Sequence, residues 1–151
     1  MGSVRREVRI ARSADDVWAV LGDPRTIAEW FPGIVEATVD GDTRVITTAS
    51  GLPMPEKIVT NDPIQRRFQY QVVAPIITHH LGTIDVFDLG DGTSLVSYAT
   101  DCVPDALALA IGGATGSALH ELARLLESGH VFGGASASLD DPADATEGGE
   151  A

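Results

Sequence analysis

Two adjacent histidines, His79 and His80, are the residues of this chain best suited to acid–base chemistry. They begin a stretch that reads as a strand, so their side chains are expected on opposite faces. His80 shares a face with Ile84 and Val86, which predicts that it points inward, although a one-residue shift in register would reverse this. An inward histidine is either a general base for an acidic C–H bond or, more commonly, a buried side chain held by one hydrogen bond.

Tyr70 and Tyr98 are the next candidates for chemistry. A buried phenol needs a partner, so an inward tyrosine is either satisfied by a neighbour or directed at a ligand carbonyl. Tyr70 alternates with Phe68 and Val72, which predicts an inward side chain. Tyr98 lies in a stretch with apolar residues on both faces, so its direction is open. Together with His80, these two tyrosines are the candidate catalytic residues.

Charged residues in the strands are expected mainly to face water. Glu56 and Asp101 are possible carboxylates of a pocket, but strand-end positions favour exposure. Arg44, Arg66 and Arg67 would suit a clamp for an acidic group at the rim of a pocket, and solvated strand ends are the simpler interpretation.

The sequence contains no motif for metal, cofactor or nucleophilic chemistry. Cys102 is the single cysteine, which excludes an internal disulfide and is typical of a small core residue. No histidines have i, i+4 spacing, so zinc ligands would have to converge from separate strands. There is also no nucleophile elbow and no glycine-rich phosphate loop. We therefore expect neither a metal nor a cofactor.

Most of the chain has the alternation of strands, which would position these side chains. The turns at residues 40–42 and 90–92 have the Asp-Gly composition of tight hairpins. Successive hairpins of this kind predict an antiparallel meander. The predicted strands cover residues 4–11, 34–39, 44–49, 54–61, 66–73, 79–89 and 93–101.

Two short helices interrupt the strands between residues 13 and 34. Ser13 is expected to cap the first, with Asp16 at the third helical position as in a capping box. The pair Asp23-Pro24 ends that helix and begins the second, since proline is tolerated in a first turn. Trp30 and Phe31 belong to the apolar face of the second helix.

A long helix is predicted from Pro104 onward, with an apolar stripe on one face. Gly112, Gly113 and Gly116 in its interior cost about 3 kcal/mol relative to alanine. These glycines predict a kink or a break. Alternatively, they keep side chains small where the helix covers a cavity or a closely packed sheet.

Composition limits the domain organisation and the partners. We expect one domain over residues 1–130 and a disordered acidic tail over residues 131–151. A net charge of −12 argues against nucleic acid and against anionic membrane surfaces. No apolar run approaches the roughly 20 residues of a membrane span. The first residues do not resemble a secretory signal, so a cytoplasmic location is expected. The oligomeric state is not indicated.

The order of these elements resembles the helix-grip fold of the START-like (Bet v 1-like) superfamily, in particular its polyketide cyclase/dehydrase and lipid-transport group. The resemblance covers about residues 4–127. It is carried by residues 14–18 (ADDVW), the pair Asp23-Pro24, residues 29–33 (EWFPG) and residues 90–93 (GDGT). It implies an α+β fold in which a curved antiparallel sheet of about seven strands holds a long C-terminal helix over a cavity.

We expect this cavity to bind a small hydrophobic or aromatic molecule, such as a lipid or a polyketide-like compound, for transport or sensing. Two alternatives stay open: a cyclase/aromatase-like enzyme with His80 and Tyr70 or Tyr98 as acid and base, and a protein-interaction module that uses the acidic tail or the outer face of the sheet. The expected ligand-binding residues are Trp30, Met54, Phe68, Tyr70, His80, Ile84, Tyr98, Ile111 and Thr115.

Overall fold

A seven-stranded antiparallel sheet forms the framework of the computed structural model, which describes residues 1–133. The strand order is β1-β7-β6-β5-β4-β3-β2, so the first strand pairs with the last. The strands are β1 (Gly2–Ile10), β2 (Ile34–Asp40), β3 (Thr43–Thr48), β4 (Pro53–Asp62), β5 (Arg67–Val72), β6 (His79–Asp88) and β7 (Ser94–Val103). Each predicted strand is present, and alternation therefore located the meander correctly.

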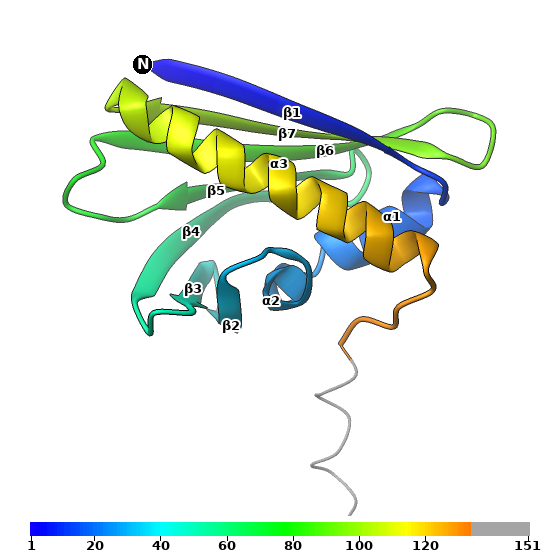
Figure 1. Ribbon diagram of the computed structural model, residues 1–151, viewed down its shortest axis with the longest axis horizontal. Helices are drawn as coiled ribbons and strands as arrows, with labels where there is room; N and C mark the ends of the chain where they lie inside the picture. Colours follow the sequence, from blue (N-terminus) through cyan, green and yellow to red (C-terminus); the bar gives the residue numbers. More distant parts are fainter. Residues whose placement is uncertain (134–151) are drawn as a thin grey trace, which may run out of the picture.

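The long helix α3 (Asp105–Glu127) lies across the sheet, with β1 on one side of it and β2 and β3 on the other (Figure 1). Hairpin turns connect the strands, with positive φ angles at Gly41 and Gly92 that side-chain-bearing residues rarely adopt. This is the α+β helix-grip arrangement expected from the sequence, with the concave face of the sheet turned toward α3.

The two short helices follow β1. Ser13 Oγ accepts a hydrogen bond from Asp16 N at the start of α1 (Ala14–Leu21), as the capping prediction required. Asp23 then caps a short 3₁₀ turn, η1 (Pro24–Thr26), that continues into α2 (Ile27–Trp30). The indole of Trp30 donates to Thr26 Oγ1, so its polar edge is satisfied inside the protein.

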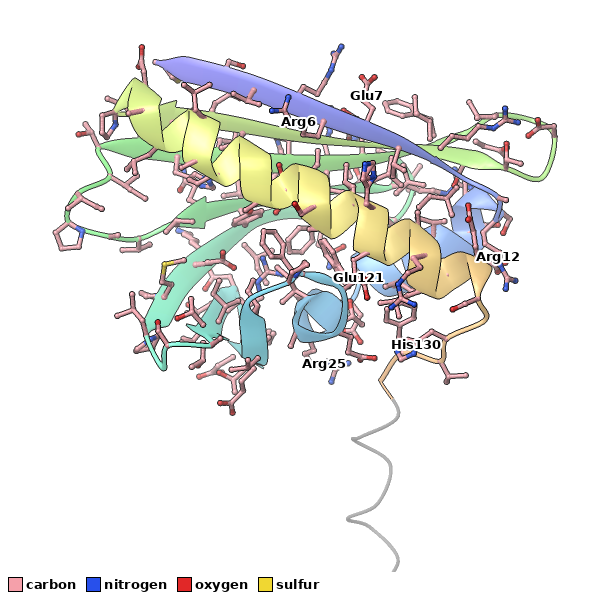
Figure 2. All side chains as sticks on the ribbon, in the orientation of Figure 1. Arg6, Glu7, Arg12, Arg25, Glu121 and His130 are labelled. Carbon is pink, nitrogen blue, oxygen red and sulfur yellow. The ribbon has the colours of Figure 1, made fainter. Side chains whose placement is uncertain are left out.

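Helix α3 is continuous through its glycines, so the predicted break is wrong. The physical reason is close packing against β1. A Cβ atom at Gly112 would lie 2.5 Å from Val4 Cγ1. The Gly112 carbonyl also accepts a hydrogen bond from Arg6 Nε, which reaches over the helix from β1 (Figure 2). These tertiary contacts offset the low helix propensity of the glycines.

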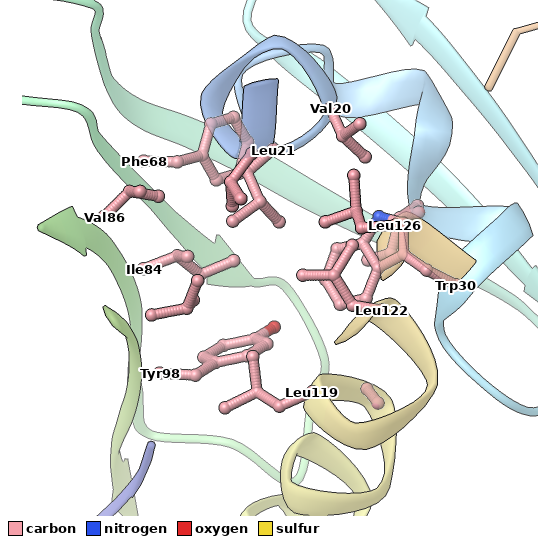
Figure 3. Packing of buried hydrophobic residues seen from close by; sticks show 14 of the residues in the cluster. Val20, Leu21, Trp30, Phe68, Ile84, Val86, Tyr98, Leu119, Leu122 and Leu126 are labelled. Carbon is pink, nitrogen blue, oxygen red and sulfur yellow. The ribbon is translucent and has the colours of Figure 1, made fainter. Parts of the chain in front are cut away.

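The hydrophobic core fills the space between α1, the C-terminal half of α3 and the inner face of the sheet (Figure 3). Ile84 and Val86 from β6 face Leu119 and Leu122 from α3, and the indole of Trp30 closes the layer from α2. This end of the sheet is therefore solidly filled, which leaves the opposite end for a cavity.

The predicted disordered tail lies outside the described residues from position 134 onward. Residues 130–133 contact the rest of the domain: His130 Nε2 is 3.0 Å from Glu29 Oε2, Gly133 N donates to Glu29 Oε1, and Phe132 packs against the core. Within residues 1–133, none of the helices has the length and hydropathy needed to cross a membrane.

Candidate functional site

An apolar cavity of about 340 Å³ lies between the N-terminal half of α3, the α2 region and the inner face of β3 to β6. Ile27 and Phe31 form one wall, Ile46 lies in the sheet, and Leu107 and Ile111 project from α3. Among the described residues, the lining side chains with polar groups are Thr48, Glu56, Tyr70 and His80.

Two of these polar side chains, Glu56 and His80, lie at neighbouring positions across three adjacent strands. Glu56 on β4 pairs with Val72 on β5, and Val72 N donates to the ring of His80 on β6. Because neighbouring strands are about 4.8 Å apart, the backbones at Glu56 and His80 are separated by about 10 Å. Val72 lies between them and also lines the cavity.

His80 points inward and is 2% exposed, whereas His79 is exposed on the opposite face. Val72 N donates to His80 Nδ1 at 3.1 Å. Burial, and next the charge of His79, lower the pKa of His80 to about 4, so the ring is neutral near pH 7. Since a backbone N–H can only donate, Nδ1 must hold the lone pair and the proton must be on Nε2.

The hydrogen bond from Val72 therefore leaves His80 poorly placed to act as a base. Its Nε2 is buried and has no hydrogen-bond partner within residues 1–133. The basic nitrogen, Nδ1, is occupied by the backbone of Val72. The general-base role considered from the sequence would require this backbone bond to break.

Tyr70 and Tyr98 are hydrogen-bonded to each other through their hydroxyl oxygens, 2.5 Å apart. Burial raises the pKa of both phenols above the ordinary value, so both are neutral. The ring of Tyr70 lines the cavity with its centroid 5.4 Å from that of His80, and Tyr98 lies behind it in the core. Gly82 makes room for Tyr70, because a Cβ atom there would overlap the Tyr70 ring.

Arg44 and Glu56 form a buried ion pair, each 3% exposed. Arg44 Nε donates to Glu56 Oε2 at 2.6 Å and Nη1 donates to the carbonyl of Pro24. The guanidinium also lies over the rings of Phe68 and Tyr70, 5.3 and 5.1 Å from their centroids. Burial raises the pKa of Glu56, an effect that Arg44 opposes.

The expectation that Arg44 and Glu56 face water is wrong. The signal was present in the alternation: Arg44 shares a face with Ile46, and Glu56 shares one with Met54. Considered singly, a charged side chain such as Arg44 or Glu56 is expected to be exposed. The two strands bring opposite charges together at paired positions, so that burial becomes tolerable.

The other charged candidates remain outside the cavity. Arg66 pairs with Asp15, and Arg67 makes a two-point contact with Asp85. Asp101 is half-buried on the other face of β7 from Cys102.

Four of the predicted ligand-binding residues line the cavity: Met54, Tyr70, His80 and Ile111. The remaining five lie elsewhere in the interior, where the helices pack on the sheet. These five are Trp30, Phe68, Ile84, Tyr98 and Thr115. Thr115 turns its hydroxyl back to the carbonyl of Gly112 within its own helix. Thr48 and Leu107 are lining residues that the sequence analysis did not assign to the pocket. Glu56, which it considered as a possible carboxylate of a pocket, also lines the cavity.

Comparison with known proteins places this geometry in a family. Residues 1–127 match the family model described as polyketide cyclase/dehydrase and lipid transport. No curated protein matches the chain significantly.

Solved structures share the fold at low identity. The protein XoxI from Bacillus cereus is 23% identical, with a TM-score of 0.78 over 87% of this chain and 100% of that one. Norcoclaurine synthase from Thalictrum flavum, in complex with dopamine and hydroxybenzaldehyde, is 19% identical, with a TM-score of 0.67 over 85% and 88% of the two chains. A START superfamily protein from Mycobacterium smegmatis is 17% identical, with a TM-score of 0.64 over 85% and 96%. The START-like fold inferred from the sequence is therefore confirmed.

Proposed function

The chain belongs to the polyketide cyclase/dehydrase and lipid transport family, and from this membership we propose that it carries or senses a small hydrophobic or aromatic molecule. The molecule occupies the cavity between α3, α2 and the sheet. Lipid-like and polyketide-like compounds are the ligand classes that the family description suggests.

The apolar cavity is the observation that carries this proposal. Its volume of about 340 Å³ is at the small end of ligand pockets, which span about 300–1,000 Å³. Aliphatic and aromatic side chains make most of its wall, with a few polar groups among them. This combination favours an apolar ligand oriented by one or two hydrogen bonds.

Catalysis is the second candidate function, and Glu56 is the observation that favours it. A carboxyl group in an apolar cavity whose pKa is raised by burial is suited to proton transfer. If the protein is an enzyme, we expect Glu56 rather than His80 to transfer the proton, because the basic nitrogen of His80 is engaged by Val72 N. The interaction hypothesis based on the acidic tail concerns residues outside the described part of the chain.

Binding of a neutral fluorescent probe, N-phenyl-1-naphthylamine, tests the proposal. Met54 is half-buried and lines the cavity, so Met54→Trp places a larger side chain in that space. Val59 lies on the same strand and is 49% exposed outside the cavity, which makes Val59→Trp the matched control.

We expect the probe to bind the unaltered protein and Val59→Trp with similar affinity, and Met54→Trp at least several-fold more weakly. Failure of the probe to bind, or equal binding by both variants, contradicts the proposal. Turnover of a bound compound that disappears in Glu56→Gln while binding persists would instead support the catalytic candidate.

A further inference from the structure

The chain stays in contact with the domain after α3 ends. Gly129 has a φ of 79°, a left-handed conformation that turns the chain back at the end of the helix. His130 N donates to the carbonyl of Leu125, and the segment then reaches α2 (Figure 1). We call residues 128–133 the C-terminal strap. The strap lies beyond the part of the chain that matches the family model.

Glu29 on α2 binds the strap through both of its carboxylate oxygens. His130 Nε2 lies 3.0 Å from Glu29 Oε2, and Gly133 N donates to Glu29 Oε1 at 2.8 Å (Figure 2). Phe132 meets the His130 ring edge-on, with the ring centroids 4.7 Å apart, and packs against the hydrophobic core. The strap is therefore attached by polar contacts to α2 and by an apolar contact to the core.

The other face of α2 forms a wall of the cavity. Ile27 and Phe31 line the cavity, and each is two residues from Glu29, which places them about 200° around the helix from it. Pro32 and Gly33, directly after α2, also line the cavity and are exposed, so this wall reaches the mouth of the cavity. One short helix thus has the ligand space on one side and the strap on the other.

Helix α2 depends on tertiary contacts for its position. It has four residues, and no side chain caps its N-terminus, so it is too short to be stable alone. Trp30 anchors it in the core, and the strap contacts its outer side through Glu29. The side chains of His130 and Glu29 are 38% and 31% exposed, and contacts between partly exposed charges are weak. The strap is therefore suited to detach while the rest of the fold stays intact.

We propose that the C-terminal strap controls the opening of the cavity. When it is attached, it keeps α2 in place and the mouth narrow; when it detaches, α2 moves outward and a ligand enters or leaves. Loosening the strap speeds entry and release together, so it changes the rates of ligand exchange more than the affinity. The control of ligand exchange rests on the proposed binding function, whereas the contact between the strap and α2 does not.

Hydrogen exchange of the ligand-free protein tests whether the strap holds α2. Glu29→Ala removes the polar contacts without lowering helix propensity, and Phe132→Ala removes the apolar contact. Val131→Ala is the matched control, because Val131 is 79% exposed within the same strap. The reporter is the amide of Phe31, which donates to the carbonyl of Ile27 in α2. We expect it to exchange several-fold faster in Glu29→Ala and Phe132→Ala and to be unchanged in Val131→Ala.

Two further measurements complete the test. Amides of β7 report any loss of global stability, and the acceleration at Phe31 should exceed theirs. Stopped-flow release of N-phenyl-1-naphthylamine then tests the control of ligand exchange. We expect Glu29→Ala and Phe132→Ala to release the probe several-fold faster than the unaltered protein, with a smaller change in equilibrium affinity. Val131→Ala should release it at the rate of the unaltered protein.

The outcomes distinguish the inference from the function on which it rests. If Phe31 exchanges at an unchanged rate in Glu29→Ala and Phe132→Ala, the strap does not hold α2 and the inference is wrong. If exchange accelerates but probe release does not, the strap holds α2 without controlling the cavity, which also overturns the inference. If the probe binds to none of the proteins, the proposed function fails together with the control of ligand exchange, and hydrogen exchange still measures the hold of the strap on α2.

Discussion

Arg44 and Glu56 meet at 2.6 Å beneath the cavity, and each side chain is 3% exposed. Their positions are directly paired between β3 and β4. A charge pair this deep contributes little net stability, because both groups lose their hydration, but either charge left alone is expensive. The pair also removes the nearest positive charge from any ligand in the cavity.

Arg44→Met is expected to lower the free energy of unfolding by about 3 kcal/mol, because it leaves Glu56 buried without a partner. The double variant Arg44→Met, Glu56→Leu should recover most of this loss. Urea denaturation of Arg44→Met, Glu56→Leu and the double variant measures the coupling energy between the two side chains. Additive losses would show that the two side chains do not act as a pair.

His80 gives the protein a specific dependence on pH. Its pKa is lowered from 6.5 to about 4, first by burial and then by His79, while Asp101 opposes the shift. As the pH falls below 6.5, the unfolded chain binds a proton that the folded protein excludes until about pH 4. The stability contributed by neutral His80 is therefore complete above pH 6.5 and is lost toward pH 4, by at most about 3 kcal/mol.

Unfolding free energies between pH 7 and pH 4 check this linkage. His80→Gln does not titrate and should show a flatter dependence than the unaltered protein. His79→Gln removes an exposed histidine from the neighbouring position and should keep most of the slope. Identical slopes for the unaltered protein and His80→Gln would mean that His80 is not buried as a neutral ring.

Gly82→Ala should narrow the cavity. The added methyl group would overlap the ring of Tyr70, which has to move from its position against Tyr98. Overpacking of this kind costs about 1–3 kcal/mol. We expect lower stability together with weaker binding of the naphthylamine probe. Unchanged binding would indicate that the position of Tyr70 does not shape the cavity.

Substitution of two adjacent glycines of α3 by alanine should change the stability of the protein in opposite directions. Gly113 faces open space, so Gly113→Ala should stabilise the helix by about 1 kcal/mol. Gly112 lies against Val4, so Gly112→Ala should destabilise the protein by separating α3 from β1. Thermal unfolding of the two variants measures both effects. Stabilisation by both would show that the helix and β1 are not closely packed.

Strand alternation correctly predicted that His80 and Tyr70 point inward, but not whether an inner residue lines the cavity or packs beneath a helix. His80 and Ile84 share the inner face of β6, yet His80 lines the cavity and Ile84 packs under Leu119 and Leu122. The difference arises from where α3 crosses the sheet, which no local pattern encodes. Capping and turn residues, in contrast, were predictable because their hydrogen bonds are local.

Two features that the sequence analysis missed depend on contacts between different elements of the fold. The continuity of α3 depends on Gly112 fitting against Val4, more than a hundred residues away. The burial of Arg44 depends on its pairing with Glu56 on the adjacent strand. Propensity and single-residue burial preferences do not include such pairings.

Native mass spectrometry of the freshly purified protein, followed by solvent extraction, tests the central claim most directly. We expect an added mass of a small neutral compound that is released into organic solvent and is absent from Met54→Trp. An unliganded mass, combined with no uptake of neutral apolar probes, would contradict the account that this cavity is a binding site.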